Sequence, residues 1–355
     1  MSDVETQPAA ADSASEPITP RENIVRTLVR NPTIVTLAVL LVIIAAFSII
    51  APDTFTQSSN FIQLAQNVAI LTVVSVGTTF VVITAGVDLS IPSGIVLGEV
   101  FAVHAMQLVK TGDGQTAADV AADASKPGYI LAALAGALLA GLIIGGINGV
   151  VVAYLKVPPL LATLGTLGAG LGAALILQNG VNTATYALDT VGHGAWIPGV
   201  PNLVVIALLV VIGGFILLHL AVFGRHTFAI GSNPEAARRV GINVERHLLK
   251  VYLIGGVSAG FAGFLSVAYF STTSIGGHST DNLQAITAVA LGGTSLFGGV
   301  GSIVGTLIGV WIPAVLKNGF VITGVQPYWQ DVSVGLVLIV AVWFDQLRRR
   351  SRDRG

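Results

Sequence analysis

Residues 31–52 read NPTIVTLAVLLVIIAAFSIIAP and contain no charged side chain. About 20 apolar residues are enough for a helix to cross the hydrocarbon core of a bilayer. This run is long enough to span a membrane and too long for the apolar core of a cleaved signal peptide, so we expect it to remain as an anchor. Further long uncharged runs follow at 54–87, 127–155, 157–188, 190–224, 251–280 and 282–316.

These runs predict an all-α polytopic membrane protein with about ten transmembrane helices. The expected spans near 284–298 and 303–317 are short and joined by glycines, so they are compatible with tilted, broken or re-entrant helices. A total of eight to eleven crossings is therefore open. The expected spans are about 33–51, 66–84, 91–109, 129–153, 158–177, 203–222, 251–269, 284–298, 303–317 and 329–347.

Composition supports the membrane class and excludes others. Of the 355 residues, 53% are hydrophobic and only 10% are charged, whereas a soluble domain carries about 25% charged residues. The net charge of −1 leaves no basic face for a nucleic acid. Because the chain has no cysteine, it has no disulfide and no thiolate metal ligand, and we expect no metal site.

The few charges predict the orientation. Basic residues of polytopic proteins stay on the cytoplasmic side, and with ten spans and both termini inside, 14 of the 17 Lys and Arg side chains fall there. We therefore expect both termini in the cytoplasm. The three basic residues that this topology places outside are Lys110, Lys126 and Lys317.

The same pattern divides the chain. Residues 1–32 are polar and rich in Ala, Ser, Pro and acids, which predicts a disordered cytoplasmic tail. Residues 33–347 form the transmembrane domain, within which 223–250 is a cytoplasmic loop, and 348–355 form a basic cytoplasmic tail.

The middle of this loop, GSNPEAARRVG, predicts one short helix. Asn233 can cap the first free N–H groups and Pro234 suits the first helical position. Glu235 lies in the first turn and Arg238 in the last, where their charges favour the helix dipole, and Gly241 can take the left-handed stop. Since about seven residues do not form a stable helix alone, this helix must dock on the membrane surface, its own bundle or a partner.

Asp88, in the string TAGVDLS, ends the second span. A carboxylate in a membrane segment costs roughly 2.5–3.5 kcal/mol unless it is solvated or paired. Asp88 therefore either borders a polar cavity, with the hydroxyls of Ser90 and Ser93 nearby, or caps the helix that follows.

Glu99 and His104 fall inside the third span, five residues apart, so they do not share a helix face. Glu99 must face the interior of the bundle, where a bond to another helix and a proton relay are the two uses open to it.

Glycines four residues apart recur and predict close helix packing within the chain. They are Gly141, Gly145 and Gly149, then Gly168 and Gly172, Gly256 and Gly260, and Gly301, Gly305 and Gly309.

The loop string resembles the EAA signature of ABC-importer permeases, and its surroundings look like the ribose/xylose-type sugar permeases. In that family the short helix fits a groove on the ATPase subunit. The resemblance assigns ATPase coupling to Asn233, Glu235, Ala236, Ala237, Arg238 and Gly241.

Two further elements resemble the same permeases. Residues 86–90, GVDLS, are similar to the family's GGIDLS, although the usual VGS is replaced by Ile91-Pro92-Ser93-Gly94, and LGGTSLFGGVGS is similar to a glycine-rich element of the second half. The resemblance implies inverted repeats that pair spans two to five with seven to ten. It places in the translocation pathway or its gates Asp88, Ser90, Ser93, Glu99, Thr294, Ser295 and Phe297.

The chain has no Gly-Lys-Ser/Thr phosphate loop and no catalytic motif. The expected function is the permease subunit of an ATP-driven importer of a monosaccharide or related polyol in the bacterial cytoplasmic membrane. It would have no catalytic residues and no cofactor of its own. Its expected partners are an ABC ATPase that binds ATP and Mg, an extracytoplasmic sugar-binding protein, a second permease chain as homo- or heterodimer, and membrane lipid.

Two other hypotheses stay open. One is a proton-coupled secondary carrier that uses Asp88, Glu99 and His104, which the docking loop disfavours. The other is a membrane scaffold or enzyme, which the lack of a reactive cluster disfavours.

Overall fold

The computed structural model describes residues 32–111 and 127–352. These residues form helices and no strand. Eight of the helices are long and apolar enough to cross a membrane. The predicted tail at 1–32 lies outside the described residues except for Pro32, whereas residues 348–352 of the predicted C-terminal tail continue α16.

The structure places the helices as follows: α2 Pro32–Ile50, α3 Pro52–Phe55, α4 Ser58–Ile83, α5 Ile91–Thr111, α7 Pro127–Ala153, α8 Pro159–Gln178, α9 Asp189–Gly192, α10 Asn202–Phe215, the π-helix η1 Ile216–Leu220, α11 Val222–Ser232, α12 Pro234–Arg239, α13 Val244–Phe270, α14 Asp281–Leu291, α15 Ile303–Ile322 and α16 Pro327–Arg352.

Each of the ten expected spans overlaps a helix, but two of them fall short of a full crossing by length and composition. α14 has only 11 residues, and the apolar part of α16 is also short. α15, expected to be short, is a full 20-residue helix. The glycine-rich segment between α14 and α15 therefore separates one short helix from one long helix.

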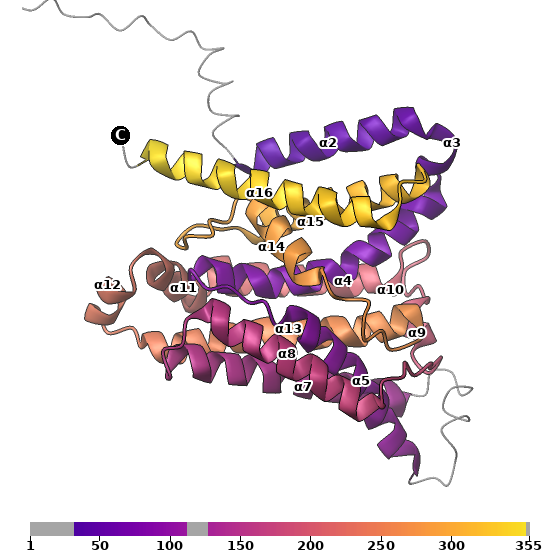
Figure 1. Cartoon of the computed structure of the whole chain (residues 1–355), viewed down its shortest axis with the longest axis horizontal. Helices are drawn as coiled ribbons and strands as arrows, with labels where there is room; N and C mark the ends of the chain where they lie inside the picture. Colours follow the sequence, from indigo (N-terminus) through magenta and orange to yellow (C-terminus); the bar gives the residue numbers. More distant parts are fainter. Residues whose placement is uncertain (1–31, 112–126, 353–355) are drawn as a thin grey trace, which may run out of the picture.

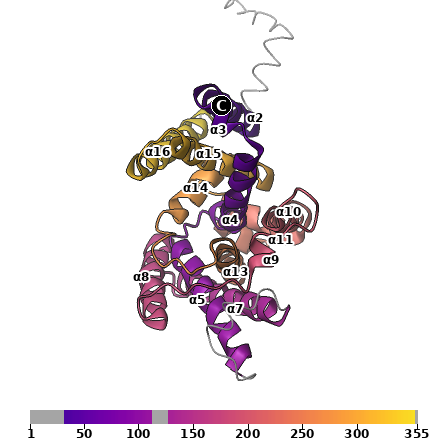
Figure 2. The ribbon, with the colours of Figure 1, turned by 90° about the vertical axis from the view of Figure 1, so that its right-hand side faces the viewer.

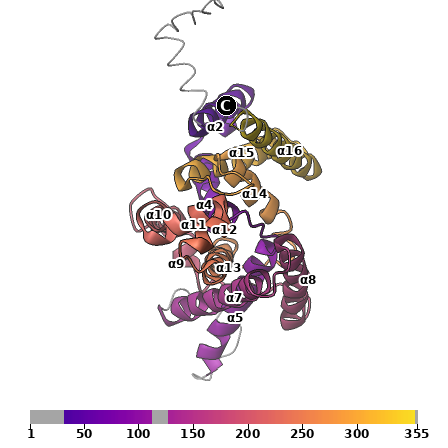
Figure 3. The same cartoon turned by 90° about the vertical axis from the view of Figure 1, so that its left-hand side faces the viewer.

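The long helices lie side by side in Figure 1 and are seen end-on in Figures 2 and 3. In both end-on views α4 and α13 occupy the middle, α2, α15 and α16 lie on one side of them, and α5, α7 and α8 lie on the other. The apolar core follows this arrangement, since buried side chains of α4, α5, α7 and α13 pack together.

The packing of the two halves corresponds. α7 packs on α13 and α5, while α15 packs on α4 and α14; α8 packs on α5, while α16 packs on α14. α4 ends beside α11 and α13 begins just after α12, so these two helices run in opposite directions. α4, α5, α7 and α8 thus correspond to α13, α14, α15 and α16 as inverted repeats.

Three of the four groups of glycines spaced four residues apart lie at close contacts between helices of the chain. A Cβ at Gly145 would lie 2.5 Å from the carbonyl oxygen of Tyr252, and one at Gly305 would overlap the backbone of Gly292. The prediction is wrong for Gly168 and Gly172, because nothing lies within 4 Å of a Cβ at either position. The same spacing therefore marks a tight contact on α7, α13 and α15 but an open face on α8.

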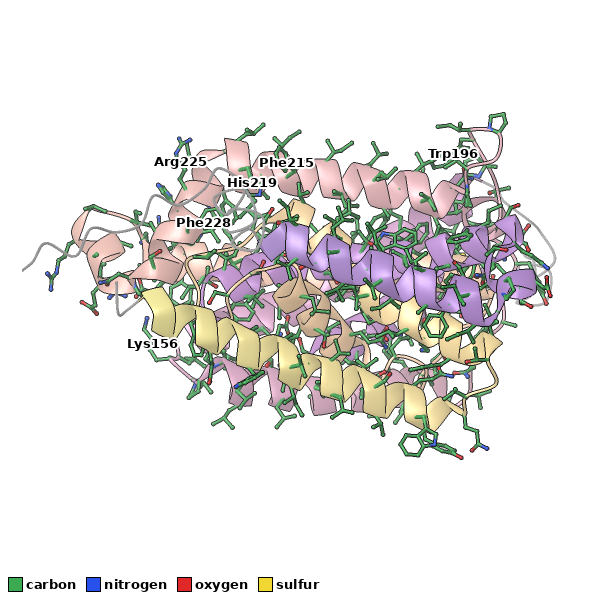
Figure 4. The ribbon with its side chains drawn as sticks, turned by 90° about the horizontal axis from the view of Figure 1, so that it is seen from above. Lys156, Trp196, Phe215, His219, Arg225 and Phe228 are labelled. Atoms are coloured by element: carbon green, nitrogen blue, oxygen red, sulfur yellow. The ribbon has the colours of Figure 1, made fainter. Side chains whose placement is uncertain are left out.

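The bundle has two distinct ends, here called the α12 end and the α9 end. Lys156 and Arg225 lie toward the α12 end and Trp196 lies at the opposite end (Figure 4). The turn that joins α4 to α5 (84–90) and the turn that joins α13 to α14 (271–280) connect consecutive helices in corresponding places of the two repeats.

Candidate coupling helix and polar turns

α12 is capped as its sequence predicts. The side-chain oxygen of Asn233 accepts a hydrogen bond from the N–H of Ala236 at 2.9 Å, and Pro234 occupies the first helical position. Gly241, two residues after the helix, has φ +89°, a left-handed value that favours glycine. The sequence contained all the local signals for this element.

One side of α12 is anchored on the bundle. Ala237 is buried in a small apolar cluster with Ile230 of α11 and Val244 of α13. The guanidinium of Arg238 lies 2.7 Å from the carboxylate of Glu245. Of the three supports that the sequence left open, the structure therefore shows that the bundle itself carries the helix.

Glu245 also accepts a second cation, because the ammonium of Lys156, between α7 and α8, lies 2.9 Å from the same oxygen. Sequence analysis did not connect these residues, which are 89 positions apart. Ion pairs exposed to solvent contribute about 0–1 kcal/mol, so the pair with Arg238 orients α12 without fixing it firmly, and the pair with Lys156 joins the α7–α8 connection to α13.

The other side of α12 faces away from the bundle. The side chain of Glu235 is 74% exposed and Val240 is 77% exposed. Ala236 and Arg239 are exposed as well. These four residues form what we call the outward face of α12, a mixed apolar and charged surface of the kind that another protein recognises.

In the α4–α5 turn, Asp88 bonds Ser90, the residue that directly precedes α5. Its Oδ1 accepts the backbone N–H of Ser90 at 2.8 Å and the hydroxyl of Ser90 at 2.6 Å, and the residue is only 3% exposed. Both bonds go to Ser90 and close a local turn ahead of α5, and the choice between the two roles expected for Asp88 stays a prediction.

A network of neutral side chains bonds to Ser90 in this turn. The amide of Asn148 on α7 donates to the hydroxyl of Ser90 at 2.7 Å, and Thr166 on α8 donates to Asn148 at 2.7 Å. Ser93 donates to the carbonyl of Ser90 at 2.7 Å. Hydroxyls and amides from three helices thus hold the turn, and Asn148 and Thr166 are members that sequence analysis missed.

Tyr252 of α13 packs against the same turn. Its hydroxyl is buried without a hydrogen-bond partner, and a Cβ at Gly86 would lie 2.8 Å from it. Gly86 therefore allows the turn to approach the ring closely.

In the α13–α14 turn the buried carboxylate comes from α5. One oxygen of Glu99 accepts the hydroxyl of Ser266 at 2.7 Å and lies 2.9 Å from Nε2 of His278, while the other accepts the backbone N–H of Ser274 at 2.7 Å. The second ring nitrogen of His278 lies 2.7 Å from Asp281. Glu99 thus joins α5 to α13 and to the start of α14.

His278 lies outside the membrane-spanning helices and has two carboxylate partners. Burial alone lowers the pKa of His278, but its hydrogen bonds to Asp281 and Glu99 raise it to about 10. The ring is therefore an imidazolium at neutral pH, and it neutralises the buried charge of Glu99. A histidine three residues before an aspartate was the only signal in the sequence.

The α14–α15 loop (292–302) is a series of tight turns. Thr294 is buried and its hydroxyl accepts the N–H of Ser302 at 3.4 Å, while the N–H of Ser295 donates to the carbonyl of Val300 at 3.0 Å. Phe297 is 42% exposed. Two of the predicted pathway residues of this loop thus stabilise its folding, and Phe297 is partly exposed beside them.

No group of three or more His, Cys, Asp or Glu side chains is placed to hold a metal ion within the described residues. The polar clusters are therefore networks of hydrogen bonds and ion pairs.

Comparison with known proteins identifies the family. Residues 60–342 match the family model described as branched-chain amino acid transport system / permease component. The chain belongs to this permease family. The ribose import permease protein RbsC of Escherichia coli K12 is 36% identical over 88% of this chain and 93% of its own length.

Other relatives cover similar shares. The fructose import permease protein FrcC of Rhizobium meliloti is 32% identical over 90% of this chain and 87% of its own length. The probable ABC transporter permease protein y4mJ of Sinorhizobium fredii is 33% identical over 82% of this chain and 83% of its own length. No solved structure matches the permease. The permease is a multi-pass inner-membrane protein, and its relatives are transport components of ABC systems.

The residues of the alternative carrier hypothesis do not form a relay in the permease. Asp88 bonds Ser90, Glu99 bonds His278, and His104 lies 2.9 Å from the carbonyl of Val100 in its own helix. The relatives are import permeases of ABC transporters, and this finding contradicts the carrier hypothesis.

Proposed function

We propose that the permease is the membrane-spanning subunit of an ATP-driven importer for a monosaccharide or a related polyol. The proposal is carried by a single observation: α12 presents a capped, outward face in a chain that is similar over its whole membrane domain to ribose and fructose import permeases. The sequence is compatible with it, since the chain carries no Gly-Lys-Ser/Thr phosphate loop.

The outward face of α12 is the proposed contact of an ABC ATPase that binds ATP and Mg. Asn233 and Gly241 set the ends of the helix, Ala237 and Arg238 attach it to the bundle, and Glu235 and Ala236 face outward. An extracytoplasmic sugar-binding protein would deliver substrate at the α9 end, and a second permease chain would complete the pathway.

The α12 end is the cytoplasmic end in this proposal. Among the side chains that the structure describes there, Lys156, Arg225, Arg238 and Arg246 are basic and lie next to or within the loop 223–250. Basic residues gather on the cytoplasmic side of membrane proteins, which puts both termini in the cytoplasm.

The pathway residues act as gate residues in this proposal. Asp88, Ser90, Ser93 and Glu99 are buried with partners inside the protomer, and these contacts would hold the turns beside the proposed pathway closed. Thr294, Ser295 and Phe297 hold or border the loop nearest α12. Opening the gates would expose their hydroxyls and carboxylates to a sugar.

An uptake assay in proteoliposomes tests the function. The permease reconstituted with its ATPase and binding protein should import radiolabelled monosaccharide only when ATP is enclosed on the ATPase side. Ribose, fructose and galactose together form the substrate panel. Uptake that persists without ATP or without the ATPase would contradict the proposal.

The docking assignment has its own test. Glu235→Arg reverses a charge on the outward face, and Gly241→Val places a β-branched residue at φ +89°. Both variants should insert normally but lose ATP-coupled uptake. Lys250→Glu, which reverses an exposed charge on α13 outside the outward face, is the matched control, with unchanged uptake. Normal uptake in both loop variants would refute the assignment.

A further inference from the structure

Three backbone segments meet where the coupling region joins the bundle. They are the end of α4 at Ile83, the end of α11 at Gly231 and Ser232, and the Gly298-Gly299 turn of the α14–α15 loop. We call this contact the backbone junction. Nothing in the coupling signature itself points to it, because Gly231 precedes that signature.

Gly231 lies at the centre of the junction. A Cβ on it would overlap the carbonyl oxygen of Ile83 and would lie 2.7 Å from the backbone nitrogen of Gly299. That nitrogen donates to the same Ile83 oxygen at 2.9 Å. The last carbonyl of α4 is therefore bonded to the α14–α15 loop while α11 crosses directly against both.

The turn on the far side is shaped for this approach. Gly298 and Gly299 have φ +86° and +76°, the left-handed region that favours glycine. A Cβ on Gly298 would lie 2.7 Å from the carbonyl oxygen of Gly231 and 3.0 Å from the Cβ of Ala85, and Ala85 itself has φ +58°. Glycine is needed at these positions because the neighbouring backbone is too close to admit a Cβ on Gly231 or Gly298.

A contact of this kind transmits displacement differently from the other attachments of α12. The ion pair of Arg238 with Glu245 is exposed and held by flexible side chains, which absorb movement by changing rotamer. Closely packed backbone has no such freedom, and packed protein transmits strain. The backbone junction is thus the stiff connection between α12 and the bundle.

The positions of the three segments show which parts of the chain the backbone junction links. Gly231 lies two residues before the cap Asn233 of α12, Ile83 directly precedes the α4–α5 turn, and Gly299 belongs to the α14–α15 loop. A shift of α11 therefore displaces both segments that carry the proposed gate residues.

We propose that the backbone junction, with Gly231 as its positioning residue, carries the movement of the coupling helix to the α4–α5 turn and to the α14–α15 loop together. This inference rests on the proposed function. A packing contact with no role in transmission is the alternative, and it predicts that a junction variant that assembles also transports.

Gly231→Ala tests the junction in the full complex with the ATPase and the binding protein. It should keep ATPase binding and ATP hydrolysis, while sugar imported per ATP falls about tenfold, since the added methyl separates α11 from α4. Gly213→Ala on α10 is the matched control, because nothing lies within 4 Å of its Cβ. An unchanged ratio of uptake to hydrolysis in Gly231→Ala would overturn the proposal.

A second measurement reads the transmitted movement itself. The chain has no cysteine, so Val87→Cys supplies a single thiol in the α4–α5 turn. In the complex with Gly231, bound ATP should change the rate of thiol alkylation by about tenfold, and in Gly231→Ala the rate should stay at its nucleotide-free value. A full ATP response in Gly231→Ala would contradict transmission through the junction.

The two measurements separate this inference from the proposed function. If the unmodified chain shows neither ATPase binding nor an ATP response, the proposed function fails; if it shows both and Gly231→Ala responds equally, only the junction fails. If Gly231→Ala does not insert, Gly299→Ala replaces it. That change meets the movable hydroxyl of Ser232 at 2.6 Å and should give a smaller loss in the same direction.

Discussion

The α4–α5 turn and the α13–α14 turn occupy corresponding places in the two repeats, and each is built around a buried carboxylate. Asp88 belongs to its own turn and bonds neutral groups, beginning with Ser90 two residues away. Glu99 belongs to α5, in the other half of the chain, and its partner His278 is 179 residues away and charged.

This difference teaches that the two repeats use different forces in equivalent places. Hydrogen bonds to neutral groups close in the sequence can be broken and remade at low cost. Removing one partner of a buried ion pair is costly, because the other charge stays buried without a counter-charge. We therefore expect the contacts of the α13–α14 turn to be more stable and the α4–α5 turn to change conformation more readily. Four predictions test this comparison.

The largest effect is expected from His278→Ala. It leaves Glu99 buried without a cation, and the loss of one partner from a buried pair costs about 3–5 kcal/mol. Thermal unfolding of the purified permease in detergent measures the loss. His104→Ala is the matched control on α5, because its ring contacts only the carbonyl of its own helix, and it should cost under about 1 kcal/mol. Equal losses in the two variants would contradict the ion-pair role.

The pH dependence of stability follows from the same pair. The pKa of His278 is raised from 6.5 to about 10 on folding, so its contribution is fully present below pH 6.5 and is lost as the pH rises to 10. The melting temperature of the unmodified permease should fall more steeply between pH 6.5 and 10 than that of His278→Ala. Parallel curves would show that the imidazolium carries no stabilisation.

A smaller effect is expected from Asp88→Ala. The N–H and hydroxyl of Ser90 lose their buried acceptor, which costs about 1–2 kcal/mol. Asp88→Asn keeps an oxygen acceptor and should cost under about 1 kcal/mol. The same unfolding assay compares the two, and a loss from Asp88→Ala as large as that from His278→Ala would erase the difference between the turns.

The smallest effect is expected from Thr166→Val. It removes one hydroxyl donor to Asn148 at the outer edge of the neutral network, a change of about 1 kcal/mol. In a double-mutant cycle with Asp88→Ala the two losses should not add, since both act through Ser90 and Asn148. Strict additivity would show that the network does not act as a unit.

The elements that depend on near neighbours in the chain could be predicted from the sequence. Asn233, Pro234 and Gly241 are separated by a few positions, and the cap, the first turn and the stop all form as expected. The spans followed from the length of their uncharged runs. α15 was underestimated at its C-terminal end, because the uncharged run stops before Lys317 whereas the helix continues to Ile322.

The candidate site was predicted only in part. Glu99 was identified as a carboxylate that needs a partner, but nothing in the sequence selects His278 over His104, which is much nearer along the chain. The glycine pairs show the same limit, since the spacing at Gly141 and Gly145 equals that at Gly168 and Gly172, and only the first pair is packed.

By itself the sequence determined that this protein is a helical bundle in a membrane with one capped, charged loop. These properties follow from the transfer of apolar runs out of water and from hydrogen bonds within a single turn, both of which act over short stretches of chain. Only the tertiary structure decided which carboxylate meets which cation and where Gly231 meets Ile83 and Gly299. Those contacts join segments far apart in the chain, and the packing of whole helices is what brings them together.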